Sequence, residues 1–138
     1  MHAPMTSFPR PKPKAVVVED DLTVAGMVAY FLELQGIACF HAGTAEEGWR
    51  IVVAEAPAMA VVDQRLPGRD GSWLLELIRH DERFTHLPVV LISGYEDLAV
   101  AARAVELGCC CLAKPFSYDQ LNDRLAEAAD LAGEWEPD

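Results

Sequence analysis

The chain has 138 residues, of which 51% are hydrophobic, and this is enough to fill the core of one domain. Its formal net charge of −11 argues against direct binding to nucleic acid, because proteins that bind nucleic acid need a basic face to neutralise phosphates. No apolar run approaches the roughly 18–20 residues that span a membrane, and the N-terminus has no apolar signal-peptide core. We therefore expect a cytoplasmic location and no membrane contact.

Short apolar runs alternate with helical patterns along most of the chain. Residues 1–13, with four prolines, are predicted to form a disordered leader, 14–132 one domain, and 133–138 a frayed tail. Strands are predicted at residues 15–18, 37–41, 59–62, 89–92 and 109–113. Helices are predicted at about 22–35, from 44 onward, and at 71–80, 97–107 and 117–131. This alternation predicts right-handed crossovers and a parallel sheet covered by helices on both faces.

Polar residues mark the beginnings of three predicted helices. Asp21 is expected to cap the first, while residues 44–47 and the pair Ser117 and Gln120 have the capping-box pattern. Helical spacing in the first helix predicts one buried face made of Val24, Met27, Val28 and Phe31, and in the third helix an inward stripe made of Leu74, Leu77 and Ile78.

Chemically reactive side chains follow four of the predicted strands. Glu19 and Asp20 come after the first strand, Asp63 after the third, Ser93 after the fourth and Lys114 after the fifth. Open α/β sheets place their reactive groups at the carboxyl ends of the strands, so these side chains are expected to converge. Three carboxylates in one pocket raise each other's pKa unless a cation compensates, and an all-oxygen ligand set suits Mg²⁺.

The order of these residues resembles the receiver domain of two-component response regulators. The loop Leu66–Gly71, which reads Leu-Pro-Gly-Arg-Asp-Gly, is a further specific match, and the resemblance extends over roughly Lys14 to Leu131. It implies an α/β, flavodoxin-like, doubly wound fold with five helices and a five-stranded parallel sheet in the order 2-1-3-4-5.

The resemblance also implies a role for each residue of the expected site. Asp63 would accept a phosphoryl group as a covalent nucleophile, and Lys114 would contribute a positive charge. Asp20 and Asp63 would bind Mg²⁺ directly, Glu19 would act through water, and the backbone carbonyl of Arg65 would complete the protein ligands.

Further residues are expected to tune the site. The resemblance implies that Ser93 is the switch hydroxyl, which would donate to a phosphoryl oxygen, and that the peptide bond before Pro115 is cis. Arg65 and Tyr95 lie two residues beyond Asp63 and Ser93, positions at which the resemblance implies control of the lifetime of the phosphoryl group.

Cys111 is the main departure from the family pattern. Receivers usually carry Tyr or Phe three residues before the lysine, and a cysteine is too small to report the motion of the switch hydroxyl in the same way. The four cysteines are expected to be free and mostly buried. Trp73 is expected either to lie partly over the surface or to contact a partner.

Two functions remain open, and a third is disfavoured. The leading prediction is a stand-alone receiver that takes phosphate from a sensor histidine kinase or a histidine phosphotransfer protein and signals to an unknown downstream protein. A homodimer is possible. The alternative is a degenerate receiver that binds proteins without phosphorylation. A phosphohydrolase is disfavoured because Arg65 occupies the position of its general acid/base, so no enzymatic turnover beyond self-phosphorylation and autodephosphorylation is expected.

Overall fold

The computed structural model describes residues 11–94 and 96–137. Most of the predicted leader and Tyr95 lie outside the described residues, so the expectations for them stay predictions. Among the residues that are described, no helix is both long enough and apolar enough to cross a membrane.

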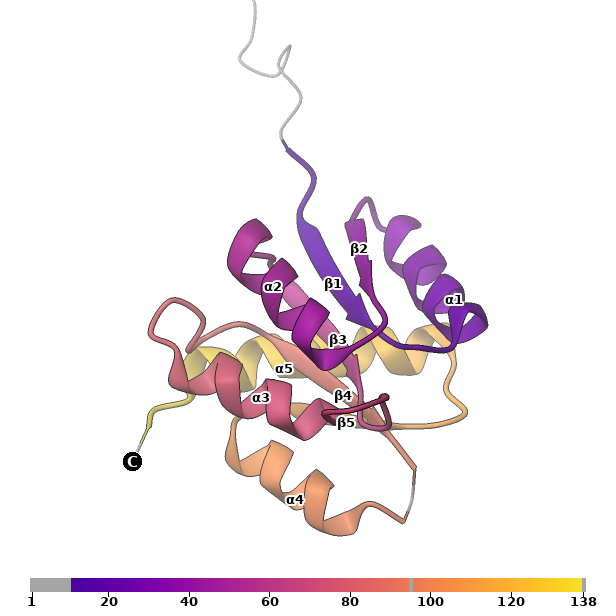
Figure 1. The fold of residues 1–138 in the computed structure, drawn as a ribbon. Coiled ribbons are helices and arrows are strands. Elements are labelled where there is room, and N and C mark those ends of the chain that lie inside the picture. The colour runs from indigo at the N-terminus through magenta and orange to yellow at the C-terminus, as the bar shows by residue number, and fades with distance from the viewer. Residues whose placement is uncertain (1–10, 95, 138) are drawn as a thin grey trace, which may run out of the picture.

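Five strands and five helices alternate along the chain (Figure 1). The strands are β1 (Lys14–Val18), β2 (Ala38–Ala42), β3 (Met59–Asp63), β4 (Val89–Ser93) and β5 (Cys110–Ala113). The helices are α1 (Leu22–Glu33), α2 (Ala45–Glu55), α3 (Gly71–His80), α4 (Leu98–Glu106) and α5 (Tyr118–Glu134). All neighbouring strands are parallel, in the order β2-β1-β3-β4-β5, which confirms the predicted fold class and strand order.

The sheet is buried on both faces, with α1 and α5 on one side and α2, α3 and α4 on the other (Figure 1). Successive residues of a strand point to opposite faces, so Val16 and Val18 pack in one core layer while Ala15 and Val17 pack in the other. A strand buried on both sides needs apolar residues at every position, and this is why the strands appear in the sequence as continuous apolar runs.

The predicted N-caps are present at three helix starts, but among the described residues the reciprocal capping box is found only at Ser117 and Gln120, and residues 44–47 make one of its two hydrogen bonds. The Asp21 carboxylate accepts hydrogen bonds from two backbone N–H groups in the first turn of α1, and the Thr44 hydroxyl accepts one from Glu47. Ser117 and Gln120 form a reciprocal capping box at the start of α5. These contacts satisfy backbone donors that have no partner inside the helix.

The predicted helix faces need two corrections. The buried face of α1 is centred on Ala25, Val28 and Leu32; of the four residues expected there only Val28 is buried, and the others are half-buried. In α3, Leu77 is half-buried and its place in the core is taken by Leu75. Trp73 is half-buried against the core, with the Arg69 guanidinium carbon 5.1 Å from its ring centroid.

Helix α5 continues to Glu134, one turn past its expected end near Leu131. The reason is a tertiary contact of the next residue: the indole Nε1 of Trp135 donates to the carbonyl of Glu106 at 2.9 Å, and its ring lies against Gly108. This contact holds the end of α5 to the end of α4. The domain limits 14–132 themselves stay a prediction.

Candidate functional site

Three carboxylates meet at the carboxyl edge of the sheet. Glu19 and Asp20 directly follow β1, and Asp63 is the last residue of β3, which pairs with β1 in parallel register. One carboxylate oxygen from each of the three residues lies within 4.8 Å of the other two. Glu19 and Asp63 are buried, with 2% and 3% of their surface exposed, whereas Asp20 is open to solvent. The predicted acidic cluster is therefore assembled by strand pairing.

Lys114 brings the opposite charge into the cluster from the end of β5. Its Nζ lies 3.2 Å from Asp63 Oδ1 and 3.7 Å from Glu19 Oε1. Partial burial lowers the pKa of this ammonium, but the hydrogen bond with Asp63 and the charges of the carboxylates outweigh it and raise the pKa above its ordinary value. Lys114 therefore stays charged at neutral pH. The bond between Lys114 and Pro115 is cis, as the resemblance implied.

The donor set fits a divalent cation. Burial, a hydrogen bond with Asp63 and the charge of Asp63 raise the pKa of Glu19 to about 8. Glu19 Oε2 is buried and has no hydrogen-bond partner within the described residues, an uncommon state for a buried polar atom. A single lysine cannot balance all three carboxyl groups in their ionised form, so without a second cation Glu19 is largely protonated at neutral pH. The cluster offers oxygen ligands and more negative than positive charge, and Mg²⁺ binds to sites of this kind.

Gln64 is a residue of this region that the sequence reasoning missed. It is buried directly after Asp63, and its backbone N–H donates to the Ile92 carbonyl at 2.8 Å. Its backbone carbonyl accepts from the N–H of Gly71, and its side-chain Oε1 accepts from the N–H of Ser72, both at 2.9 Å. Gln64 thus ties β3 to β4 and to the first turn of α3. The loop that carries Arg65 is fixed at both ends as a result.

The Arg65 side chain extends away from the core toward the loop after β4. Its Nη2 lies 3.1 Å from Glu96 Oε1 and 3.4 Å from Asp97 Oδ1. The backbone of Arg65, which is expected to supply a metal ligand, follows Asp63 by two residues. Tyr95, its expected partner in tuning the site, lies outside the described residues. Both roles stay predictions.

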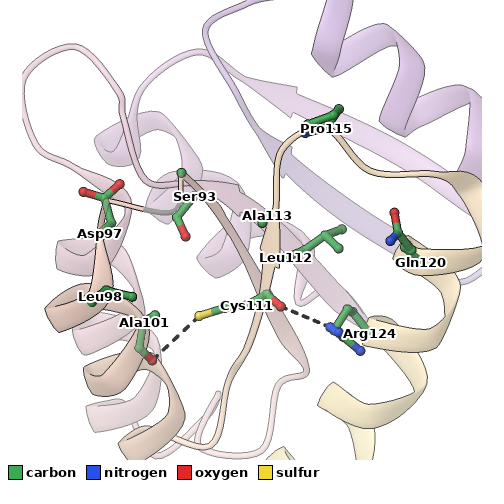
Figure 2. A pocket seen from close by; sticks show the side chains of 11 residues that line it. Ser93, Asp97, Leu98, Ala101, Cys111, Leu112, Ala113, Pro115, Gln120 and Arg124 are labelled. Atoms are coloured by element: carbon green, nitrogen blue, oxygen red, sulfur yellow. Dashed lines mark hydrogen bonds between the residues drawn. The ribbon is translucent and has the colours of Figure 1, made fainter.

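Ser93 and Cys111 line one cavity of about 360 Å³ between α4, β5 and the start of α5 (Figure 2). Ser93 ends β4 next to Asp63 and is 6% exposed. The Cys111 Sγ lies 3.7 Å from the carbonyl of Ala101 in α4, and the Cys111 carbonyl accepts from Arg124 Nε. All four cysteines are free, and burial raises the pKa of the Cys111 thiol. The small Cys111 side chain therefore leaves open space beside α4.

Comparison with known proteins identifies the family. Residues 15–126 match the family described as the response regulator receiver domain. The chain is 34% identical over 117 residues to the response regulator protein FleR of Pseudomonas aeruginosa, covering 84% of this chain and 24% of that protein. It is 25% identical over 119 residues to sporulation initiation phosphotransferase F of Bacillus subtilis, covering 86% of this chain and 94% of that protein.

Solved structures agree with this result. A putative response regulator from Chloroflexus aurantiacus is 28% identical, with a TM-score of 0.79 over 88% of this chain and 99% of that one. The chain belongs to the receiver domain family of response regulators. It spans about a quarter of the length of FleR and about half that of the phosphate regulon regulator PhoB.

Membership of the family carries general properties. Receiver domains of two-component systems are phosphorylated by histidine kinases or by phosphotransfer proteins, and they generally bind Mg²⁺. In this chain the cluster of Glu19, Asp20 and Asp63 could hold such an ion.

Proposed function

We propose that this chain is a receiver domain that accepts a phosphoryl group in a cytoplasmic two-component pathway. Asp63 takes a phosphoryl group from a sensor histidine kinase or a histidine phosphotransfer protein, and the phosphorylated domain acts on a downstream protein by contact, as a monomer or a homodimer. No separate substrate is turned over. The observation that carries the proposal is the buried Asp63 carboxylate, which lies 3.2 Å from Lys114 and within 4.8 Å of the oxygens of Glu19 and Asp20.

The proposed transfer is an in-line displacement at phosphorus. A carboxylate oxygen of Asp63 forms the new O–P bond while the P–N bond of the donor histidine breaks, and its electron pair stays on the imidazole nitrogen. Lys114 balances charge on the phosphoryl oxygens, and Ser93 donates its hydroxyl proton to one of them. Asp20, Asp63 and the Arg65 carbonyl would hold Mg²⁺, with Glu19 acting through water; bound there, the ion supplies positive charge to the phosphoryl oxygens.

The test of this proposal is the intact mass of the protein after incubation with acetyl phosphate and Mg²⁺. We expect a gain of one phosphoryl group, because the site combines a nucleophile, a cation site and a lysine. The gain should be absent in Asp63→Asn and absent when Mg²⁺ is removed by a chelator. A gain that persists in Asp63→Asn would place the phosphoryl group elsewhere and reject the assignment.

A degenerate receiver that binds proteins without phosphorylation is the second candidate. Cys111 favours it, because the cavity beside this residue leaves α4 without a bulky neighbour on β5. A folded protein that binds Mg²⁺ but gains no phosphoryl group would support this candidate over the first.

Arg65 and Tyr95 are expected to set the lifetime of the phosphoryl group by limiting the access of water. In the double variant Arg65→Ala with Tyr95→Ala, we expect faster loss of the phosphoryl group, because the resemblance to receivers assigns control of water access to these two positions. The decay of the phosphorylated mass after removal of the donor measures the lifetime. Arg50→Ala, an exposed arginine on α2, serves as the control. Equal lifetimes for the double variant and the unchanged chain would reject the idea.

A further inference from the structure

Arg65 links two loops at the mouth of the phosphoryl-acceptor site. It belongs to the loop after β3, and its guanidinium is ion-paired with Glu96 and Asp97 in the loop after β4. These strands are neighbours, and Asp63 at the end of β3 pairs in register with Ile92, the residue before Ser93. The arginine therefore spans the gap between the ends of the two strands that carry the expected acceptor and switch hydroxyl.

Asp97 is held in an arrangement that leaves α4 uncapped. It occupies the N-cap position of α4, yet within the described residues its side chain accepts no hydrogen bond from the first turn of that helix. Instead Oδ1 contacts Arg65, and Oδ2 is buried with no hydrogen-bond partner among the described residues. Aspartate is among the best N-cap residues, so capping is the natural use of this carboxylate. The contact with Arg65 competes with it.

The ion pairs of Arg65 are weak enough to exchange. The Arg65 side chain is 68% exposed and that of Glu96 is 63% exposed, and such pairs contribute little in water. Asp97 is only 16% exposed, but its contact with the exposed guanidinium is long, at 3.4 Å. A phosphoryl group on Asp63 would bring about 1.5 to 2 negative charges and three strong acceptor oxygens. A guanidinium prefers the paired oxygens of a phosphoryl group because its fork of N–H donors matches them.

We propose that Arg65 detects the phosphoryl group by binding to it. Its guanidinium exchanges the ion pair with Asp97 for hydrogen bonds to the phosphoryl oxygens, and the freed Asp97 side chain then caps the first turn of α4. The inference rests on the proposed function, because it needs a phosphoryl group on Asp63. Space for the rearrangement is present, since Asp97 and Leu98 border the cavity that also contains Ser93 and Cys111 (Figure 2). In this switch the movement of Arg65 changes the N-cap of α4, so no large side chain is needed at the position of Cys111.

The experiment follows the backbone amides of Ala99 and Val100 by NMR in the ¹⁵N-labelled full chain, with and without acetyl phosphate and Mg²⁺. Intact mass is measured on the same samples. In the unchanged chain, phosphorylation should shift these two amides downfield, because capping places a carboxylate on their N–H groups. In Arg65→Met the two amides should already be shifted before phosphorylation and should move no further in the phosphorylated fraction.

Two further variants make the result specific. Asp97→Ala removes the capping carboxylate and should show no downfield shift in either state. Arg83→Met removes a comparable exposed arginine, whose partner is Asp81, and should behave like the unchanged chain. The inference is overturned if Arg65→Met starts at the unshifted position and moves on phosphorylation as the unchanged chain does. Absence of the mass gain in the unchanged chain would instead overturn the proposed function itself.

Discussion

The substitution Gly71→Ala should both destabilise the domain and abolish phosphoryl acceptance. A β-carbon at this position would collide with the backbone carbonyl oxygen of Asp63 and lie 3.0 Å from its carbonyl carbon and from the Gln64 Cα. Neither side can yield, because Asp63 is held in β3 and Gly71 donates its N–H to the Gln64 carbonyl. We expect a loss of about 1–3 kcal/mol in the free energy of unfolding, typical of overpacking a tight site.

The effect on function follows from which atoms would move. The backbone of Asp63 and Gln64 would have to shift, and with it the acceptor carboxylate and the Arg65 carbonyl expected to bind the metal. Denaturant unfolding measures the stability, and intact mass after treatment with acetyl phosphate measures the acceptance.

Gly26→Ala is the matched control for this prediction. Gly26 is exposed within α1 and a β-carbon there meets nothing within 4 Å. Alanine should therefore stabilise the helix by about 0.5–1 kcal/mol and leave phosphoryl acceptance unchanged. If Gly71→Ala keeps both the stability and the mass gain of the unchanged chain, the close approach of α3 to Asp63 is not what fixes the site.

The fold and the central charges of the site were predictable from the sequence because they follow one rule. Parallel strands end at a common edge, so Asp63, Lys114 and the acids after β1 had to converge once the strands were recognised. The helix caps were predictable because they depend only on residues three apart, as at Ser117 and Gln120.

Contacts between distant parts of the chain could not be predicted in this way. The ion pairs of Arg65 reach residues 31 and 32 positions away, and the indole of Trp135 bonds to a carbonyl 29 positions away. Gln64 follows the acceptor without any pattern that marks its side chain as a hydrogen-bond acceptor for α3. In these cases tertiary packing decides which partner a side chain finds.

Arg79 is the clearest example, because a charged residue near the end of an amphipathic helix is normally solvent-exposed. It is 1% exposed, and its guanidinium donates to three backbone carbonyls, those of Leu107 at 2.6 Å, Gly108 at 3.3 Å and Phe84 at 3.5 Å. Burial lowers the pKa of this arginine. Two of the carbonyls lie at the end of α4, where a positive charge also complements the helix dipole.

Arg79→Leu is expected to lower the free energy of unfolding by about 3 kcal/mol. Each buried carbonyl that loses its donor costs about 1–3 kcal/mol, and the leucine recovers part of this by packing against the core. The free energy of unfolding of Arg79→Lys should fall between those of the unchanged chain and Arg79→Leu, because an ammonium keeps the charge but not the fork of donors that reaches several carbonyls. Denaturant titration of the three proteins measures the effect.

Folded Arg79→Leu should still accept a phosphoryl group. Arg79 lies at the carboxyl end of α3, and its partners Leu107 and Gly108 precede β5, so the contact belongs to the edge of the sheet opposite Asp63. Arg79→Leu should therefore still gain a phosphoryl group under native conditions, whereas Gly71→Ala should not. Arg83→Leu, which removes an exposed arginine paired with Asp81, should leave the unfolding curve unchanged. A stability of Arg79→Leu equal to that of Arg83→Leu would show that water replaces the guanidinium without cost.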